Sequence, residues 1–241
     1  MQHSPSSLEF FMHTISLFNL LYLLPPLFIV AFFYYRWVGK KTEIAFATLR
    51  MSIQLIVIGY VLTSLFETNA FWLLALLVAV MITTASLIAR RNIHRKDFEV
   101  YAAILISIAL GGTLNLALVL WGVLELDNPL DPRYVIPLSG MIYANAMNAI
   151  SLAAERYEKE REHHDKYKAR SIAFKASMMP QINSFLAVGF VSLPGMMTGQ
   201  ILSGVDPLIA VRYQIVVMAM ILSSGAMSNI LYLSYMTSKE E

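Results

Sequence analysis

Long apolar runs alternate with short polar or charged stretches along the 241-residue chain. Several runs reach or exceed the roughly 20 residues that an α-helix needs to cross the hydrocarbon core of a bilayer. The pattern predicts about seven membrane-spanning helices, near residues 15–36, 43–66, 70–90, 98–124, 133–154, 178–203 and 209–236. We therefore expect an all-α, polytopic integral membrane protein with one membrane domain over residues 1–241.

The composition agrees with a multi-pass protein of a cell membrane. Charged residues make up only 14% of the chain and hydrophobic residues 57%, whereas a soluble domain carries about 25% charged residues. The chain has no cysteine, which excludes disulfides, thiolate metal sites and cysteine nucleophiles. In a bacterium the expected location is the inner or plasma membrane.

The basic residues predict the orientation. Most of the 18 Lys and Arg residues follow the first, third, fifth and seventh runs. With seven spans these stretches share one side, which the positive-inside rule assigns to the cytoplasm. We therefore expect the N-terminus outside and the C-terminus inside. The segment 155–177, after the fifth span, is the longest charged connection and is expected in the cytoplasm.

Motifs for nucleotide binding and hydrolysis are absent from the sequence. It contains no phosphate-binding G-x-x-x-x-G-K-[ST], no H-E-x-x-H zinc helix and no G-x-S-x-G nucleophile elbow. The chain is thus not expected to be an enzyme, to bind a cofactor or to bind nucleic acid. If it uses ATP, a partner subunit must hydrolyse it.

Polar residues inside the apolar runs are the candidates for function. The fifth run carries Asn145 and Asn148, and the sixth carries Gln181, Ser184 and Ser192. If the sixth run is helical throughout, Gln181, Ser184 and Ser192 share a face with two glycines further on. These side chains either hydrogen-bond neighbouring helices or line a transport path.

The stretch "VSLPGMMTGQILSG", residues 191–204, contains residues that weaken a helix. Pro194 favours a kink, and Gly195 with Gly199 forms a G-x-x-x-G pattern that permits close helix packing. We interpret the three as a hinge and packing element, with packing alone as the alternative. Met196 and Met197 are weak candidates for a soft metal, since methionine more often fills space.

Two further positions have open interpretations. Arg50 lies inside the second run and either extends to the cytoplasmic surface or pairs within the protein near Gln54. Asp206 faces the outside in the expected topology. It either helps to release a cation or, with Pro207, only forms a turn.

Three stretches carry a resemblance to a known family: "LRMSIQLIVIGYVL", "IPLSGMIYANAMNAISLAAER" and "MPQINSFLAVGFVSLPGMMTGQILSGVDPLIAVRYQIVVM". Together they resemble the FetB-type family of ABC transporter permeases. The likeness runs in order from about residue 45 to residue 235, and it is ungapped over residues 188–214.

The resemblance implies a small permease that works with a separate ATP-binding cassette ATPase, as a homodimer in the bilayer. Bacterial members are linked to iron export. Plant relatives are linked to aluminium tolerance, with UDP-glucose as a suggested cargo. The expected function is therefore the membrane subunit of an exporter of iron or another metal, with a nucleotide sugar as the other cargo.

One departure from the family concerns the segment 155–177, which is shorter here and lacks the family's glycine-containing turn. It remains the expected ATPase contact, through Glu155, Arg156, Lys159, Arg161, Lys166 and Arg170. Glu155–Lys159 and Glu162–Lys166 have the spacing of helical ion pairs. Because the segment is short, the alternative is a scaffold or regulator that has lost its ATPase.

Overall fold

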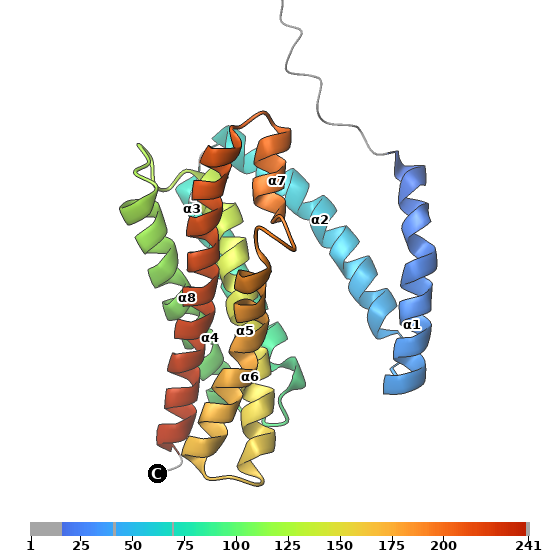
Figure 1. Ribbon diagram of the computed structural model, residues 1–241, viewed down its shortest axis with the longest axis vertical. Helices are drawn as coiled ribbons and strands as arrows, with labels where there is room; N and C mark the ends of the chain where they lie inside the picture. Colours follow the sequence, from blue (N-terminus) through green and yellow to red (C-terminus); the bar gives the residue numbers. More distant parts are fainter. Residues whose placement is uncertain (1–15, 41, 69, 240–241) are drawn as a thin grey trace, which may run out of the picture. The chain divides into compact units, whose positions relative to one another are not determined.

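The computed structural model describes residues 16–40, 42–68 and 70–239. The chain forms two compact units, one ending at Thr68 and the other beginning at Asn69 (Figure 1). All regular elements of the described residues are helices, which confirms the all-α expectation. Whether both units form one domain stays a prediction.

The first unit contains two long apolar helices. Its elements are η1 (Leu17–Leu23), α1 (Leu24–Val38) and α2 (Glu43–Thr68). Gly39 ends α1 in the left-handed conformation, with φ of 80°, and its N–H donates to Tyr35 at 2.8 Å. The Tyr34 hydroxyl donates to the Glu43 carboxylate at 2.7 Å, which joins α1 to the start of α2. No described side chain of α1 is buried, as suits a helix surrounded by lipid.

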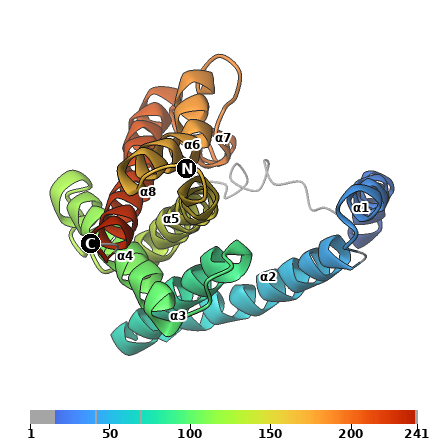
Figure 2. The same ribbon diagram turned by 90° about the horizontal axis from the view of Figure 1, so that it is seen from below.

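The second unit is a helical bundle around α5. Its elements are α3 (Phe71–Ala89), η2 (Arg90–Asn92), α4 (Phe98–Ala117), η3 (Leu118–Val123), α5 (Pro132–Arg161), α6 (Lys166–Ala187), α7 (Gly195–Leu202) and α8 (Pro207–Lys239). Helix α5 contacts α3, α4, α6 and α8, and Figure 2 shows these helices around it.

Small residues allow the helices of this bundle to pack closely. Ala146 and Ala153 of α5 have no exposed surface, and Ala149 has 2%. On α4, a Cβ atom added at Gly111 would lie 2.5 Å from the Ser228 hydroxyl oxygen of α8 and 2.8 Å from its backbone nitrogen. Since side chains between membrane helices gain little from the hydrophobic effect, such close backbone contact stabilises their association.

Six helical segments among the described residues are long and apolar enough to cross a membrane. They are Phe18–Val38, Glu43–Phe66, Phe71–Asn92, Phe98–Val123, Pro132–Arg161 and Pro207–Lys239. This confirms a polytopic membrane protein, and most expected boundaries are close to the observed ones. Residue 15, where the first expected span begins, lies outside the described residues. Helix α5 continues to Arg161, beyond residue 154 where the fifth expected span ends, and where that helix leaves the membrane stays a prediction.

The expected sixth span, 178–203, is wrong as a continuous helix. Helix α6 ends at Ala187, residues 188–194 are not helical, and α7 begins at Gly195. Gly189 has φ of 93°, a left-handed conformation. Pro194 lacks an N–H and disfavours helix at the residue before it. It therefore sits in extended conformation at the start of α7 and does not kink a longer helix.

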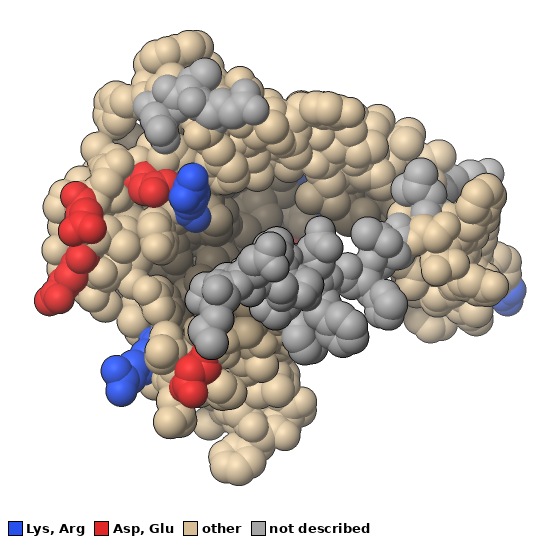
Figure 3. Space-filling view, turned by 90° about the horizontal axis from the view of Figure 1, so that it is seen from above, with Lys and Arg blue, Asp and Glu red and all other residues tan. Residues whose placement is uncertain are grey.

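The segment 155–177 is not a single helix. It comprises the last turns of α5, the turn 162–165 and the first half of α6. This turn, the stretch 90–97 and the end of α8 lie at one end of the second unit (Figure 1). The stretches 124–131 and 203–206 lie at the other end, where Figure 3 shows scattered charged side chains, some of them next to one another, on a largely uncharged surface. The orientation across the membrane stays a prediction.

Candidate functional site

A cleft of about 190 Å³ lies between α5, α6 and α8. Four of the residues that the sequence singled out line it: Asn145, Asn148, Gln181 and Ser184. The rest of the lining is Ala149, Leu152, Ser177, Pro180, Phe185, Met218 and Ile221. The walls therefore offer amide and hydroxyl groups and no charge.

The two asparagines of α5 contribute differently to the cleft. Asn145 is half-buried and donates through its amide nitrogen to the Met141 carbonyl of its own helix, at 2.8 Å. The Asn148 side chain is exposed toward the cleft. The amide nitrogen of Asn145 is thus bonded within α5. Its amide oxygen remains available to water or a ligand in the cleft.

Gln181 is the most constrained polar residue of the cleft. Its side chain is 8% exposed, and its amide oxygen has no hydrogen-bond partner among the described residues. A Cβ added at Gly225 of α8 would lie 2.4 Å from the Gln181 amide nitrogen, so any larger residue there would require the Gln181 side chain to move. A buried oxygen without a partner costs about 1–3 kcal/mol, so water or a ligand in the cleft would stabilise this side chain.

A hydrogen bond next to the cleft joins α6 to α8. The Asn229 amide nitrogen donates to the Ser177 hydroxyl at 2.9 Å, and that hydroxyl donates to the Phe174 carbonyl at 2.9 Å. The sequence analysis missed Ser177, Gly225 and Asn229. The spacing of these residues could have revealed them. Ser177 lies one helical turn before Gln181, and Gly225 lies one turn before Asn229, so each pair shares a helix face.

The other predicted residues of the sixth run lie outside this cleft. Ser192 is exposed in the stretch 188–194, where its carbonyl accepts a hydrogen bond from Gly189 at 3.0 Å. A Cβ added at Gly195 or Gly199 would meet nothing within 4 Å, so no helix of the second unit packs against them. The expectation of one shared helix face is wrong, because α6 ends at Ala187.

The weak metal candidates are not brought together. Met197 lines a second cleft and Met196 a third. The Asp206 carboxylate accepts the Leu208 N–H at 2.8 Å at the start of α8, which fits a turn. In the described part of the chain, no group of three or more His, Asp or Glu residues is placed to hold a metal.

Arg50 and Gln54 lie one turn apart on α2, in the first unit. Both side chains are exposed, and no hydrogen bond joins them among the described residues of that helix. Their predicted roles stay predictions.

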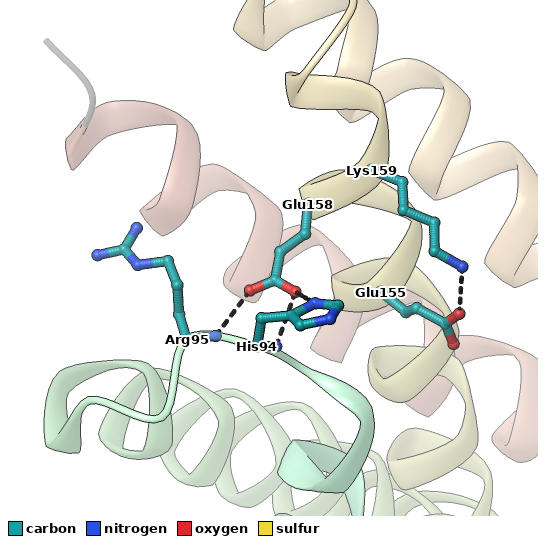
Figure 4. Close-up of polar contacts among 5 residues, drawn as sticks. All are labelled: His94, Arg95, Glu155, Glu158 and Lys159. Atoms are coloured by element: carbon teal, nitrogen blue, oxygen red, sulfur yellow. Dashed lines mark hydrogen bonds and ion pairs between the residues drawn. The ribbon is translucent and has the colours of Figure 1, made fainter.

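The predicted coupling residues surround the turn between α5 and α6. Lys159 pairs with Glu155 at 2.7 Å, as expected (Figure 4), and Arg156 pairs with Glu160 at 2.7 Å. The expected Glu162–Lys166 pair on one helix is wrong, because α5 ends at Arg161 and α6 begins at Lys166. Arg161 donates to the His164 carbonyl, and Lys166 and Arg170 lie over the Tyr167 ring.

Glu158 connects this region to the stretch 90–97, a contact that the sequence analysis missed. Its carboxylate accepts the backbone N–H groups of His94 at 3.0 Å and Arg95 at 3.1 Å (Figure 4). The Glu158 side chain is only 19% exposed. Because a charged acceptor strengthens both bonds, the stretch 90–97 is held against α5 and should move with it.

Asp165 begins α6. Its carboxylate accepts the backbone N–H groups of Tyr167 at 2.9 Å and Lys168 at 3.1 Å, as expected of a helix N-cap. These bonds, above all that from Lys168, hold the pKa of the carboxyl group below its usual range. The cap fixes where α6 starts and therefore the geometry of the turn.

A protein-family profile described as "Uncharacterised protein family (UPF0014)" matches residues 17–240. The chain belongs to this family. The match confirms the family that the three sequence stretches indicated, and several of its members are named as membrane proteins.

Three UPF0014 relatives illustrate the breadth of the family. The "UPF0014 membrane protein slr1647" of Synechocystis is 35% identical, covering 81% of this chain and 82% of its own. The "Probable iron export permease protein FetB" of Escherichia coli is 34% identical over 81% of both chains. "Protein ALUMINUM SENSITIVE 3" of Arabidopsis thaliana is 31% identical over 78% of this chain and 73% of its own. No solved structure matches the chain significantly.

Proposed function

We propose that this UPF0014 protein is the membrane-spanning permease subunit of an ABC-type exporter, powered by a separate ATPase subunit. The observation that carries the proposal is the cleft between α5, α6 and α8, lined by Asn145, Asn148, Gln181 and Ser184. Polar side chains in membrane helices are costly and commonly mark a transport path. The likeness to the E. coli relative named an iron export permease supports export as the activity.

The proposed cargo is a metal cation such as iron. Amide and hydroxyl oxygens are hard ligands that can replace part of a cation's water shell. Without a carboxylate in the cleft, binding should be weak, and a transport path needs cargo to leave as well as enter. A nucleotide sugar fits less well, because the lining has no Arg or Lys to pair with its phosphates.

The proposed ATPase contact is the end of the second unit that carries the turn 162–165 and the stretch 90–97. Arg156, Lys159 and Arg161 lie beside that turn, and Glu158 ties the two segments together. Nucleotide binding in the ATPase would displace both segments together and shift α5 against α6. The permease subunit is also proposed to work as a homodimer.

A transport assay tests the proposal. The full chain is expressed in a host that lacks its own iron exporters, and radioactive iron retained by iron-loaded cells is measured. The unmodified protein should lower retention, and Gln181→Leu, which removes the amide, should restore it to the level of an empty vector. Met179→Leu is the matched control, because Met179 is exposed on the same helix and lines none of the described clefts. Equal efflux by both variants would contradict a path through the cleft.

Gentle solubilisation of the tagged chain tests the partner. A stoichiometric P-loop ATPase should copurify and should be lost when Arg156 and Lys159 are both replaced by alanine. If the chain is a scaffold without an ATPase, neither copurification nor iron efflux will be found, although the protein is in the membrane.

A further inference from the structure

A second cleft, of about 320 Å³, lies next to the first along α6 and α8. Its walls are mostly apolar, and they include the non-helical residues between α6 and α7. Its lining comprises Phe185, Val188, Gly189, Leu193, Pro194, Met197, Val211, Gln214, Ile215, Met218 and Ala219. Only Phe185 and Met218 also line the first cleft.

Both helices place the shared residues between the clefts. Along α6, Ser177, Gln181 and Ser184 line the first cleft and Phe185 lines both, and Val188, directly after the helix, lines the second. Helix α8 runs in the opposite direction, and there Gln214 lines the second cleft, Met218 both, and Ile221 the first. Two antiparallel helices thus give the same order, with one apolar pair at the junction.

A buried amide lies on each side of this apolar pair. Gln181, in the first cleft, is 8% exposed, and Gln214, in the second, is 5% exposed. Neither amide oxygen has a hydrogen-bond partner among the described residues. Each glutamine lies four residues, or about 6 Å along the axis, from Phe185 or Met218 on its own helix. Both oxygens therefore need water or cargo in the cleft beside them.

The backbone between α6 and α7 is not helical. Non-helical backbone at membrane depth is tolerated only where protein buries it or where it lines a water-filled cavity. Val188, Gly189, Leu193 and Pro194 line the second cleft, and the Phe190 side chain between them is fully exposed. The N–H groups of Val188, Val191 and Ser192 bond to the end of α6, and water in that cleft would satisfy the backbone groups that remain.

We propose that the two clefts are successive chambers of one transport path, and that Phe185 and Met218 form the gate between them. The inference rests on the proposed function for its cargo, a hydrated metal cation. A constriction of two apolar side chains can close a path by excluding water, without any change in covalent structure. A shift of α6 against α8 would separate the pair, so that the cation passes from Gln181 to Gln214.

The absence of native cysteine makes the test direct. Ser184→Cys places one thiol in the first chamber, and Met197→Cys places one in the second. A charged, membrane-impermeant thiol reagent is added to either side of sealed vesicles that contain the full-length protein, and labelling rates are measured. With the gate closed, the two thiols should react from opposite sides. Leu186→Cys is the control, because Leu186 is 76% exposed and lines neither cleft.

The gate is then widened in the Ser184→Cys background. Phe185→Ala and, separately, Met218→Ala should raise labelling from the far side about tenfold or more, because a shorter side chain lets water through. Leu186→Ala should leave the rate unchanged. Labelling of Ser184→Cys from both sides with the gate intact would overturn the proposal, as would no effect of either alanine. Labelling needs neither ATP nor iron, so loss of iron efflux, which tests the proposed function, is scored separately.

Discussion

Three amide side chains of the second unit are buried among apolar residues. Asn229, Gln181 and Gln214 are nearly buried, and each has an amide oxygen without a described partner. Of the three, only Gln181 was predicted from the sequence as a polar residue in an apolar run. Their surroundings were not predictable, since the contact between Gln181 and Gly225 joins helices that are far apart in the chain. A sequence pattern shows which residues share a face of one helix, but it does not show which other helix packs against that face.

The stability of the bundle should depend on Gly111. Gly111→Ala would place a Cβ atom 2.8 Å from the backbone nitrogen of Ser228, and backbone cannot move aside as a side chain can. Overpacking of this kind costs about 1–3 kcal/mol, so the thermal midpoint of the purified protein in detergent should fall. Gly59→Ala is the control, because the added methyl group meets nothing within 4 Å and alanine favours helix. Equal midpoints for the two variants would contradict the close packing of α4 on α8.

At the scale of elements, the break between α6 and α7 was only partly predictable. The sequence indicated a weakened helix from Pro194, Gly195 and Gly199, and the structure does interrupt the helix near them. The break begins earlier, after Ala187, because Gly189 takes a left-handed conformation that no sequence rule required. The cleft residues Gln181 and Ser184 were still grouped correctly, since both lie on the helical part. Ser192 was grouped wrongly, because helical spacing has no meaning beyond the break.

The start of α6 should make stability depend on pH through Asp165. Its pKa is lowered in the folded protein, so its contribution is complete above the unfolded pKa and is lost as pH falls through the folded pKa. Asp165→Ala should lower the thermal midpoint at neutral pH by about 2–4 °C, and the difference from the unmodified protein should shrink in acid. Asp97→Ala is the matched control, because Asp97 begins α4 without a side-chain cap bond. A difference that persists at the lowest pH would contradict the role of the ionised cap.

At the scale of the whole molecule, basic segments that are far apart in the sequence gather at one end of the second unit (Figure 1). The stretch 90–97 and the turn 162–165 lie at the same end (Figure 1), where Glu99 also bonds Lys239 and Tyr235 near the end of α8. The sequence predicted that these segments share a side, because their basic residues follow alternate spans. It could not predict that Glu158 joins two of them, since ion-pair and capping partners depend on how helices pack.

The contact between Glu158 and the stretch 90–97 should transmit movement within the second unit. Glu158→Ala removes the acceptor of two backbone bonds, and bonds to a charged group contribute about 1.5–3 kcal/mol. The amides of His94 and Arg95 should then exchange hydrogen faster, and iron efflux should fall while the ATPase still copurifies, because the basic side chains of the turn remain. Asp127→Asn, at the other end of the unit, is the control and should change neither. Faster exchange with unchanged efflux would mean that the stretch 90–97 does not transmit movement from the ATPase, and coupling would then rest on the turn between α5 and α6 alone.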